Sequence, residues 1–297
     1  MPSRALRLFH LGSWASRHAP APVASAASGL AGAIAVAMAG DKRQQVERNL
    51  RRIHGRPLSR WELQRGVQAT FANYARYWIE SFRLPGTPPE VLDAGIAIEG
   101  WEHVEAGLER GHGVILALPH LGSWEWAGFW VAACKEVPIS VVVESLEPRD
   151  VYEWFVGLRE SFGMHVIPLG PRASSEVLAA LRANHLVCLL SDRDISGSGI
   201  EVEFFGETTT LPAGPATLAL RTGAALIPTA ALYEGGHRRG IVRPALDPTR
   251  TGPFRQDVRR LTQELAHELE AFIRLAPEQW HLLQPNWPSD ALAAEPA

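Results

Sequence analysis

The chain has 297 residues, of which 46% are hydrophobic and 21% are charged, with a formal net charge of −3. These proportions are typical of a globular protein and exclude a disordered or fibrous chain. Two cysteines exclude a disulfide framework, and the near-neutral charge does not indicate nucleic acid as a partner. The charge is uneven, because residues 1–66 hold 11 basic and 3 acidic residues and residues 67–297 are acidic. We therefore expect the amino-terminal end to face an anionic membrane surface.

Residues 19–40 carry no charged side chain and are numerous enough to span a bilayer. Ala, Gly, Ser and Pro dominate this segment, so we expect an interfacial or protein-packed helix rather than a membrane span. Flanking basic residues are predicted to face lipid headgroups: Arg4, Arg7, Lys42, Arg43, Arg48, Arg51 and Arg52. Phe9, Leu11 and Trp14 are predicted to enter the interface below them. The alternative is a helical hairpin that covers the core.

Two helices are predicted next, over residues 41–53 and 59–82. Ser59 and Glu62 form a capping-box pattern at the start of the second. Aromatic residues recur along this second helix at close to helical spacing: Trp61, Phe71, Tyr74, Trp78 and Phe82. Such spacing predicts either a core-facing stripe or one wall of a lipid-binding groove.

From residue 96 onward, short apolar runs alternate with helical segments. Strands are predicted at residues 114–118, 139–143, 165–169, 186–190, 225–232 and 240–246, and helices at 124–134, 149–162, 174–183, 215–222 and 255–275. This alternation predicts an α/β fold with a mostly parallel central sheet and helices on both faces. We expect one domain, in which residues 1–66 form a basic, membrane-associating helical segment, residues 67–287 form the core and residues 288–297 are a disordered tail.

A histidine follows the first of these predicted strands, in the run Pro-His-Leu-Gly-Ser-Trp-Glu at residues 119–125. The carboxyl ends of parallel strands are where sites form, and an imidazole accepts a proton near pH 7. Glu125 stands in the first turns of the following helix, where its carboxylate can orient the imidazole of His120, as the acid does in a catalytic triad. The alternative is a His that binds backbone groups and a Glu that interacts with the helix dipole.

A second polar cluster, Ser191-Asp-Arg-Asp194, follows the predicted strand at residues 186–190. In a doubly wound sheet this strand end is expected to share a crevice with His120. Asp-x-Asp after an apolar strand also holds a divalent metal in many nucleotide-sugar glycosyltransferases, so a metal-dependent glycosyltransferase is the main competing interpretation. The simplest alternative is a turn whose two Asp side chains cap backbone amides.

Taken together, these motifs resemble those of bacterial lipid acyltransferases, the group that includes the late lipid A acyltransferases. The similar stretches occur in fixed order over almost the whole chain, at residues 119–125, 143–144, 159–165, 192–194, 204–206, 211–219 and 277–280. The run from Asp192 to Glu207 is most similar to the actinobacterial branch that acylates phosphatidylinositol mannoside. The basic, apolar amino terminus and the Arg-rich, GC-rich residue usage agree with that branch.

The resemblance implies a peripheral enzyme at the cytoplasmic face of the plasma membrane. Such an enzyme moves a long acyl chain from acyl-CoA, for which palmitoyl-CoA is the expected donor, to a mannose hydroxyl of the glycolipid. No metal or other cofactor is expected. The remaining alternatives are the glycosyltransferase, a lipid A-type acyltransferase with another glycolipid acceptor, and a non-catalytic membrane-surface protein.

The resemblance also implies roles for particular residues. The catalytic set that it implies is His120 as base, Glu125 as the acid of the motif, and a further acid that pairs with the His, for which Asp194 and Asp192 are favoured. The substrate-binding set that it implies is Glu144, Arg159, Arg193 and Glu201, of which Glu201 is also a less favoured partner for the His. In this scheme the backbone amides at the helix start after His120 are expected to stabilise the oxyanion.

Overall fold

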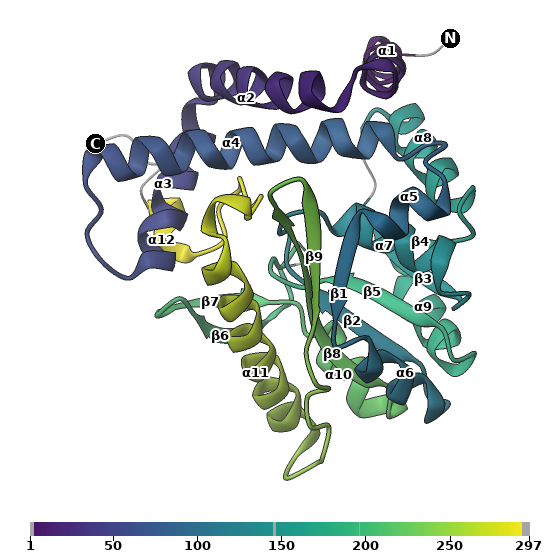
Figure 1. Ribbon diagram of the computed structural model, residues 1–297. Helices are drawn as coiled ribbons and strands as arrows, with labels where there is room; N and C mark the ends of the chain where they lie inside the picture. Colours follow the sequence, from purple (N-terminus) through teal and green to yellow (C-terminus); the bar gives the residue numbers. More distant parts are fainter. Residues whose placement is uncertain (1–2, 145–146, 196, 293–297) are drawn as a thin grey trace.

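The computed structural model describes residues 3–144, 147–195 and 197–292. Within these residues, seven strands form one sheet in the order β1-β9-β8-β2-β5-β3-β4 (Figure 1). The strands are β1 (Ile96–Glu99), β2 (Val114–Leu118), β3 (Ile139–Val143), β4 (His165–Pro168), β5 (Leu186–Leu190), β8 (Ala225–Glu234) and β9 (His237–Val242). Neighbouring strands run parallel except β8 and β9, so the prediction of a mostly parallel sheet is confirmed.

The predicted strands fall where the apolar runs occur, and the differences lie at the edges. β2, β3 and β5 have the predicted bounds, while β9 begins and ends earlier than predicted. Three strands were not predicted: the short edge strand β1, and the antiparallel hairpin of β6 (Ile200–Phe204) and β7 (Glu207–Leu211). β6 alternates Glu with apolar residues, whereas β7 contains three consecutive Thr residues. The hairpin packs through β6 against the last long helix, outside the main sheet.

Helices cover both faces of the sheet, as predicted. One face packs against α9 (Ala173–Arg182), α10 (Gly214–Thr222) and α11 (Phe254–Leu275). The other face packs against α5 (Pro89–Ala94), α6 (Trp101–Glu109) and α7 (Trp124–Cys134), with α8 (Arg149–Glu160) beside β4. The site-bearing ends of β2 and β5 therefore lie inside a layered α/β domain rather than on a flexible appendage.

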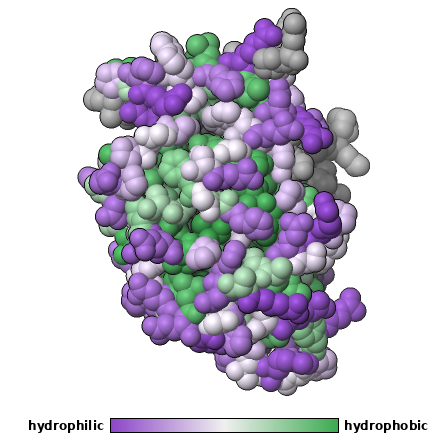
Figure 2. Space-filling view, turned by 90° about the vertical axis from the view of Figure 1, so that its right-hand side faces the viewer, coloured by the Kyte–Doolittle hydropathy of each residue, from purple (hydrophilic) through white to green (hydrophobic). Residues whose placement is uncertain are grey.

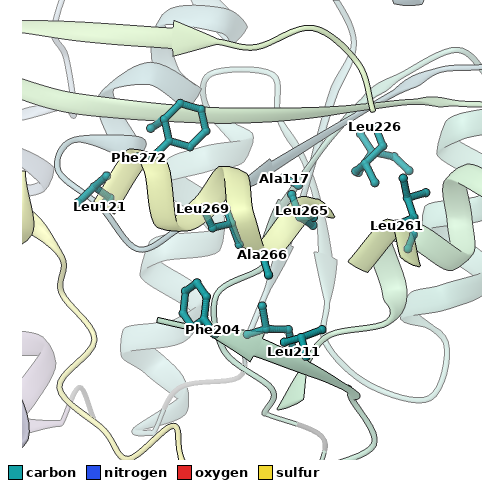
Figure 3. Packing of buried hydrophobic residues seen from close by; sticks show 14 of the residues in the cluster. Ala117, Leu121, Phe204, Leu211, Leu226, Leu261, Leu265, Ala266, Leu269 and Phe272 are labelled. Carbon is teal, nitrogen blue, oxygen red and sulfur yellow. The ribbon is translucent and has the colours of Figure 1, made fainter. Parts of the chain in front are cut away.

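The helix α11 anchors the chain next to His120. Its apolar side chains face the sheet, and Figure 3 shows Leu265 and Phe272 turned toward Ala117 and Leu121. Leu121 is completely buried in this cluster. The residue directly after His120 is thus fixed by packing in the core, and it holds the backbone of His120 in position.

The amino-terminal part of the described chain consists of α1 (Arg4–His18), α2 (Ala21–Met38), α3 (Gly40–His54) and α4 (Arg60–Arg83), which precede α5 and the sheet. The capping box of Ser59 and Glu62 is present at the start of α4. Figure 1 shows α2 lying along the long helix α4 at the top of the molecule. Among the described residues, no helix has both the length and the apolar character that crossing a membrane requires.

The outer faces of α1 and α2 carry large apolar side chains in contact with solvent: Leu11, Trp14, Val23, Leu30, Ile34 and Met38. Phe9, which was expected beside them, instead packs edge-on against Trp78, Phe82 and Phe155. Exposed apolar surface is not confined to these helices. On the face shown in Figure 2, hydrophobic side chains gather in the middle and hydrophilic ones surround them.

The basic residues of α3 divide into two groups. Lys42, Arg43 and Arg51 are exposed, as expected for contact with lipid headgroups. Arg52 is instead nearly buried, with its Nη2 2.7 Å from Asp290 Oδ1, and the Nε of Arg48 lies 3.4 Å from the same oxygen. The prediction that Arg48 and Arg52 face lipid is therefore wrong, because both are paired with a buried carboxylate. The side chain of Arg4 lies outside the described part of the chain.

Part of the segment predicted to be a disordered tail is helical. Residues 288–292 form the helix α12 (Pro288–Leu292), and Asp290 within it is fully buried. Besides the arginines, its carboxylate accepts hydrogen bonds from Gln45 Nε2 at 2.9 Å and from the Asn286 amide at 3.0 Å. The prediction of disorder is wrong for these five residues, and residues 293–297 lie outside the described part of the chain.

Candidate active site

The register of two neighbouring strands brings His120 to Asp192. β2 and β5 are parallel, with Leu118 opposite Leu190, so the residues two positions beyond these strand ends lie side by side. The Asp192 carboxylate accepts the His120 backbone amide at 2.9 Å, and its Oδ1 lies 2.7 Å from His120 Nδ1. The side chain of Asp192 is fully buried, whereas that of His120 is 26% exposed. When Nδ1 carries a proton toward this carboxylate, Nε2 keeps a lone pair that can accept one.

Other groups hold the Asp192 carboxylate in place. The Trp280 indole donates to its Oδ2 at 2.7 Å, and the Asn286 side chain donates to its backbone carbonyl at 3.1 Å. Burial opposes ionisation, but the charge on His120 and the hydrogen bonds from His120 and Trp280 keep the pKa of Asp192 below its ordinary value. A charged, fully buried carboxylate against Nδ1 fixes the imidazole and stabilises its protonated form.

Glu125 does not perform this role. Its carboxylate forms an ion pair with Arg159 of α8 and accepts a hydrogen bond from the Tyr77 hydroxyl at 3.4 Å. The hypothesis that Glu125 orients the imidazole is therefore corrected, because Asp192 occupies Nδ1 and Glu125 instead binds the guanidinium. Burial, followed by the charge on Glu125, raises the pKa of Tyr77 well above its ordinary value, so this hydroxyl stays protonated and donates.

The other two candidate acids lie elsewhere. Asp194 accepts the backbone amides of Gly197 and Gly199 at 3.1 and 2.7 Å, so it organises the loop that follows β5. Glu201 lies on the β6–β7 hairpin, 3.0 Å from Arg259, and is absent from the described cavity wall. Of the acids that were left open as partners of His120, the structure pairs Asp192 with the imidazole.

The backbone amides between His120 and α7 are already hydrogen-bonded. The amides of Leu121, Gly122 and Ser123 donate to the carbonyls of Pro119, Gln279 and Ala231 at 2.7–3.0 Å. These three amides, which lie between His120 and the start of α7, are therefore unavailable to an oxyanion, and the role expected for the amides at the start of α7 itself stays a prediction.

A buried network fixes this loop from behind. The Ser123 hydroxyl bonds to the carboxylate of Glu80 on α4, which also accepts Nε of Arg238 at 2.8 Å and the Tyr233 hydroxyl at 3.3 Å. The Arg238 guanidinium in turn lies over the Trp126 ring, 3.6 Å from its centroid. The sequence did not reveal this network, because Glu80 lies 43 or more residues from each of its partners and no local pattern connects them.

His120 opens onto a cavity of about 350 Å³. Apolar and aromatic side chains make up most of its wall, including Trp78, Trp124, Val141 and Leu190. The polar members of the wall include Tyr74, Tyr77, His120, Glu125, Glu144, Tyr152, Arg159, Arg193, Thr229, His281 and Gln284. The structure therefore brings four predicted residues, Glu125, Glu144, Arg159 and Arg193, into one cavity with His120.

This arrangement suits proton transfer beside a long apolar substrate. A partly exposed imidazole with a buried carboxylate behind it can act as a general base, and the apolar wall favours an alkyl chain. Within the described ranges, no group of three or more His, Cys, Asp or Glu side chains is placed to hold a metal ion. Asp192 and Asp194 point their carboxylates at different partners, which disfavours a shared cation between them.

Comparison with known proteins agrees with this chemistry. The family described as bacterial lipid A biosynthesis acyltransferase matches residues 1–289. A phosphatidylinositol mannoside acyltransferase of Mycolicibacterium smegmatis is 42% identical over 250 residues, covering 83% of this chain and 80% of that protein. A phosphatidylinositol mannoside acyltransferase of Mycobacterium tuberculosis is 42% identical over 252 residues, covering 83% and 78%.

Proposed function

We propose that this chain, which belongs to the bacterial lipid A biosynthesis acyltransferase family, transfers a long-chain acyl group. In the proposed reaction the group moves from acyl-CoA to a mannose hydroxyl of phosphatidylinositol mannoside. The observation that carries the chemistry is the His120–Asp192 pair at the wall of a mostly apolar cavity. The acceptor is inferred from the names of the two mycobacterial relatives. Palmitoyl-CoA is the donor that we propose.

In the proposed mechanism His120 is the general base. Nε2 accepts the proton of the mannose hydroxyl while the hydroxyl oxygen attacks the thioester carbonyl carbon. Asp192 stabilises the resulting imidazolium, and the CoA thiolate takes the proton when the carbon–sulfur bond breaks. General base catalysis of this kind contributes about 10²–10⁴-fold to the rate. Water can replace the sugar hydroxyl, so slow hydrolysis of acyl-CoA is an expected side reaction.

Charged residues at the cavity wall are proposed to hold the polar parts of the two substrates. Glu144 and Arg159 are assigned to the acceptor, and Arg193 to a phosphate of CoA, because a guanidinium binds phosphate through two hydrogen bonds. Glu125 keeps the Arg159 guanidinium in a defined position. Glu201 has no assigned role, since its partner is Arg259 on the surface.

The enzyme is proposed to work as a peripheral protein at the cytoplasmic face of the plasma membrane. The exposed apolar side chains of α1 and α2 support this proposal, because they can enter the lipid interface without a spanning helix. The exposed Lys42, Arg43 and Arg51 lie on the next helix and add attraction to anionic lipid.

One experiment tests the activity directly. Purified protein is incubated with radiolabelled palmitoyl-CoA or palmitoyl-acyl carrier protein and with phosphatidylinositol mannosides, phosphatidylinositol or a lipid A precursor, and the labelled lipids are identified. We expect label on the mannoside, with acyl-CoA as donor, with and without EDTA, and none with His120→Ala. Label on the lipid A precursor alone would favour the other acceptor class. Loss of the reaction in EDTA would favour a metal-dependent enzyme.

A further inference from the structure

A second histidine at the cavity wall has no partner for its ring. His281 is 6% exposed and belongs to the wall that contains His120. Both of its ring nitrogens are buried, and neither has a hydrogen-bond partner among the described residues. Leaving such a polar group unsatisfied costs free energy, so a native protein that keeps one commonly uses it.

The backbone places this ring in a fixed relation to the base. The His281 amide donates to the His120 carbonyl at 2.8 Å, and the neighbouring residues Trp280 and Leu121 form an antiparallel bridge. The His281 ring packs against Tyr74, Tyr77 and Trp124, with ring centroids 5.5–5.6 Å apart. The His120 ring contacts the same Trp124 side chain at 5.6 Å. The imidazoles of His120 and His281 therefore both contact Trp124, and both lie at the wall of the same cavity.

The His281 ring can supply a hydrogen-bond donor that the three amides directly after His120 cannot. The tetrahedral intermediate carries an oxyanion, yet the amides of Leu121, Gly122 and Ser123 are bonded elsewhere. Burial, and secondly the charge on His120, lower the pKa of His281 to about 3, so its ring is neutral at pH 7 and has one N–H donor. A neutral imidazole donates a hydrogen bond to a developing oxyanion without adding a positive charge beside the imidazolium of His120.

We propose that His281 is a catalytic residue whose ring N–H donates a hydrogen bond to the acyl carbonyl oxygen as that oxygen becomes negative. The inference rests on the proposed acyl transfer. The acceptor oxygen forms a bond to the carbonyl carbon, its proton passes to His120, and the carbonyl electron pair moves to the oxygen held by His281. When the pair returns, the carbon–sulfur bond breaks and the thiolate takes the proton from His120. The proton of His281 remains on His281 throughout.

The replacement His281→Phe distinguishes this role from a structural one. Phe fills a similar volume and removes two unsatisfied nitrogens, so a purely structural histidine predicts equal or higher melting temperature with unchanged activity. We expect equal or higher melting temperature together with a fall in kcat of about 10²–10³-fold, the usual loss for one oxyanion donor, and little change in KM. His281→Gln keeps an N–H donor and should recover part of the loss. His112→Phe, an exposed histidine at the opposite end of β2, is the matched control and should behave as wild type.

Two reactions are measured for each variant: palmitoyl transfer to the mannoside and hydrolysis of palmitoyl-CoA by water. Both pass through the same oxyanion, so both should fall together. A fall in transfer alone would assign His281 to acceptor binding, and unchanged kcat in both reactions would exclude any catalytic part; either result overturns the proposal. Absence of transfer in the wild type, with hydrolysis still dependent on His281, would instead contradict the proposed acceptor and leave the role of His281 supported.

A measurement on the wild-type protein covers the case in which His281→Phe does not fold. Histidines are labelled with ¹⁵N, and a long-chain alkyl trifluoromethyl ketone, whose hydrate imitates the tetrahedral intermediate, is added. We expect the ring N–H signal of His281, assigned with His281→Gln, to move downfield. A shift of the His120 ring signals without any shift at His281 would contradict the proposal.

Discussion

Charges at the strand-end site and charges on the amino-terminal helices are held in different ways. At the site, two acids are held by partners within the fold: Asp192 binds His120 and Trp280, and Glu125 binds Arg159. On α3, adjacent arginines differ, since Arg51 is exposed whereas Arg52 is paired with buried Asp290. The role of a basic residue is therefore not determined by whether it lies in a basic segment of the sequence. It is determined by whether the side chain pairs with a buried carboxylate. Catalysis, stability and membrane binding should respond to different substitutions.

The largest effect is expected at the base. His120→Ala should reduce palmitoyl transfer by about 10⁴-fold or more, because both the proton acceptor and the later proton donor are lost. Its melting temperature should stay near that of wild type, since His120 is partly exposed. Turnover and thermal melting are measured on the same preparation. A variant that melts normally and transfers acyl groups at the wild-type rate would remove His120 from the mechanism.

The next largest effect is expected from the two aspartates of the Asp-Arg-Asp run, whose replacements should differ in kcat. Asp192→Asn should lower kcat by about 10²–10⁴-fold, because the amide cannot stabilise the imidazolium and favours the wrong tautomer. Asp194→Asn is the matched variant and should lose much less, since the Asp194 carboxylate binds the loop amides of Gly197 and Gly199 rather than the imidazole. Steady-state kinetics of both variants test the assignment. Equal losses would mean that the loop, rather than the His–Asp contact, limits the reaction.

The paired arginine of α3 should affect stability. Arg52→Gln leaves the Asp290 carboxylate without its closest cation, and breaking a buried ion pair typically costs about 3–5 kcal/mol of the free energy of unfolding. Arg51→Gln, one residue earlier and exposed, should change it by less than about 0.5 kcal/mol. Urea unfolding measures both. Similar values for the two variants would show that the pair contributes little.

The pH dependence of stability should depend on His281. Burial lowers its pKa in the folded state from 6.5 to about 3, so below pH 6.5 the unfolded chain binds a proton that the folded chain does not. The stability of the wild type should therefore fall as pH decreases from 6.5 toward 3, with this residue contributing up to about 1.4 kcal/mol per pH unit. His281→Phe should lose that contribution. Parallel stability curves for wild type and variant between pH 4 and 6.5 would contradict it.

The smallest effect per residue is expected at the exposed cations. Each of Arg43→Gln and Arg51→Gln should weaken binding to anionic vesicles by about 1 kcal/mol, and high salt should do the same. Hydrolysis of short-chain, soluble thioesters should be almost unchanged, because the cavity is unaltered. Vesicle sedimentation measures the binding. Full binding by the double variant would assign membrane contact to the apolar faces of α1 and α2 alone.

Local patterns were sufficient to predict the elements that carry the site. The apolar runs at residues 114–118 and 186–190 predicted β2 and β5 and placed His120 and the Asp-Arg-Asp run at one sheet edge. Deciding whether Asp192 or Asp194 pairs with His120 required the register of these two strands. A shift of two residues would place the other aspartate beside the imidazole. Register depends on the packing of the whole sheet, which no short pattern contains.

Partners that are distant in the sequence could not be predicted. Arg159 lies 34 residues after Glu125, and nothing near either residue indicates their ion pair. Asp290 looked like part of a polar tail, because its partners Gln45 and Arg52 lie more than 230 residues earlier. The orphan ring of His281 is likewise visible only once its neighbours are in place.

The contacts of residues 279–281 have a consequence for synthesis of the protein. A chain emerging from the ribosome contains His120 and Asp192 long before it contains Gln279, whose carbonyl holds Gly122, or Trp280, whose indole holds Asp192. Translation therefore completes the sheet before it completes the site. A nascent chain that stops before Pro277 has His120 and Asp192 but lacks the segment that holds them in place, so the proposed acyl transfer requires that residues 277–281 have been synthesised and have docked.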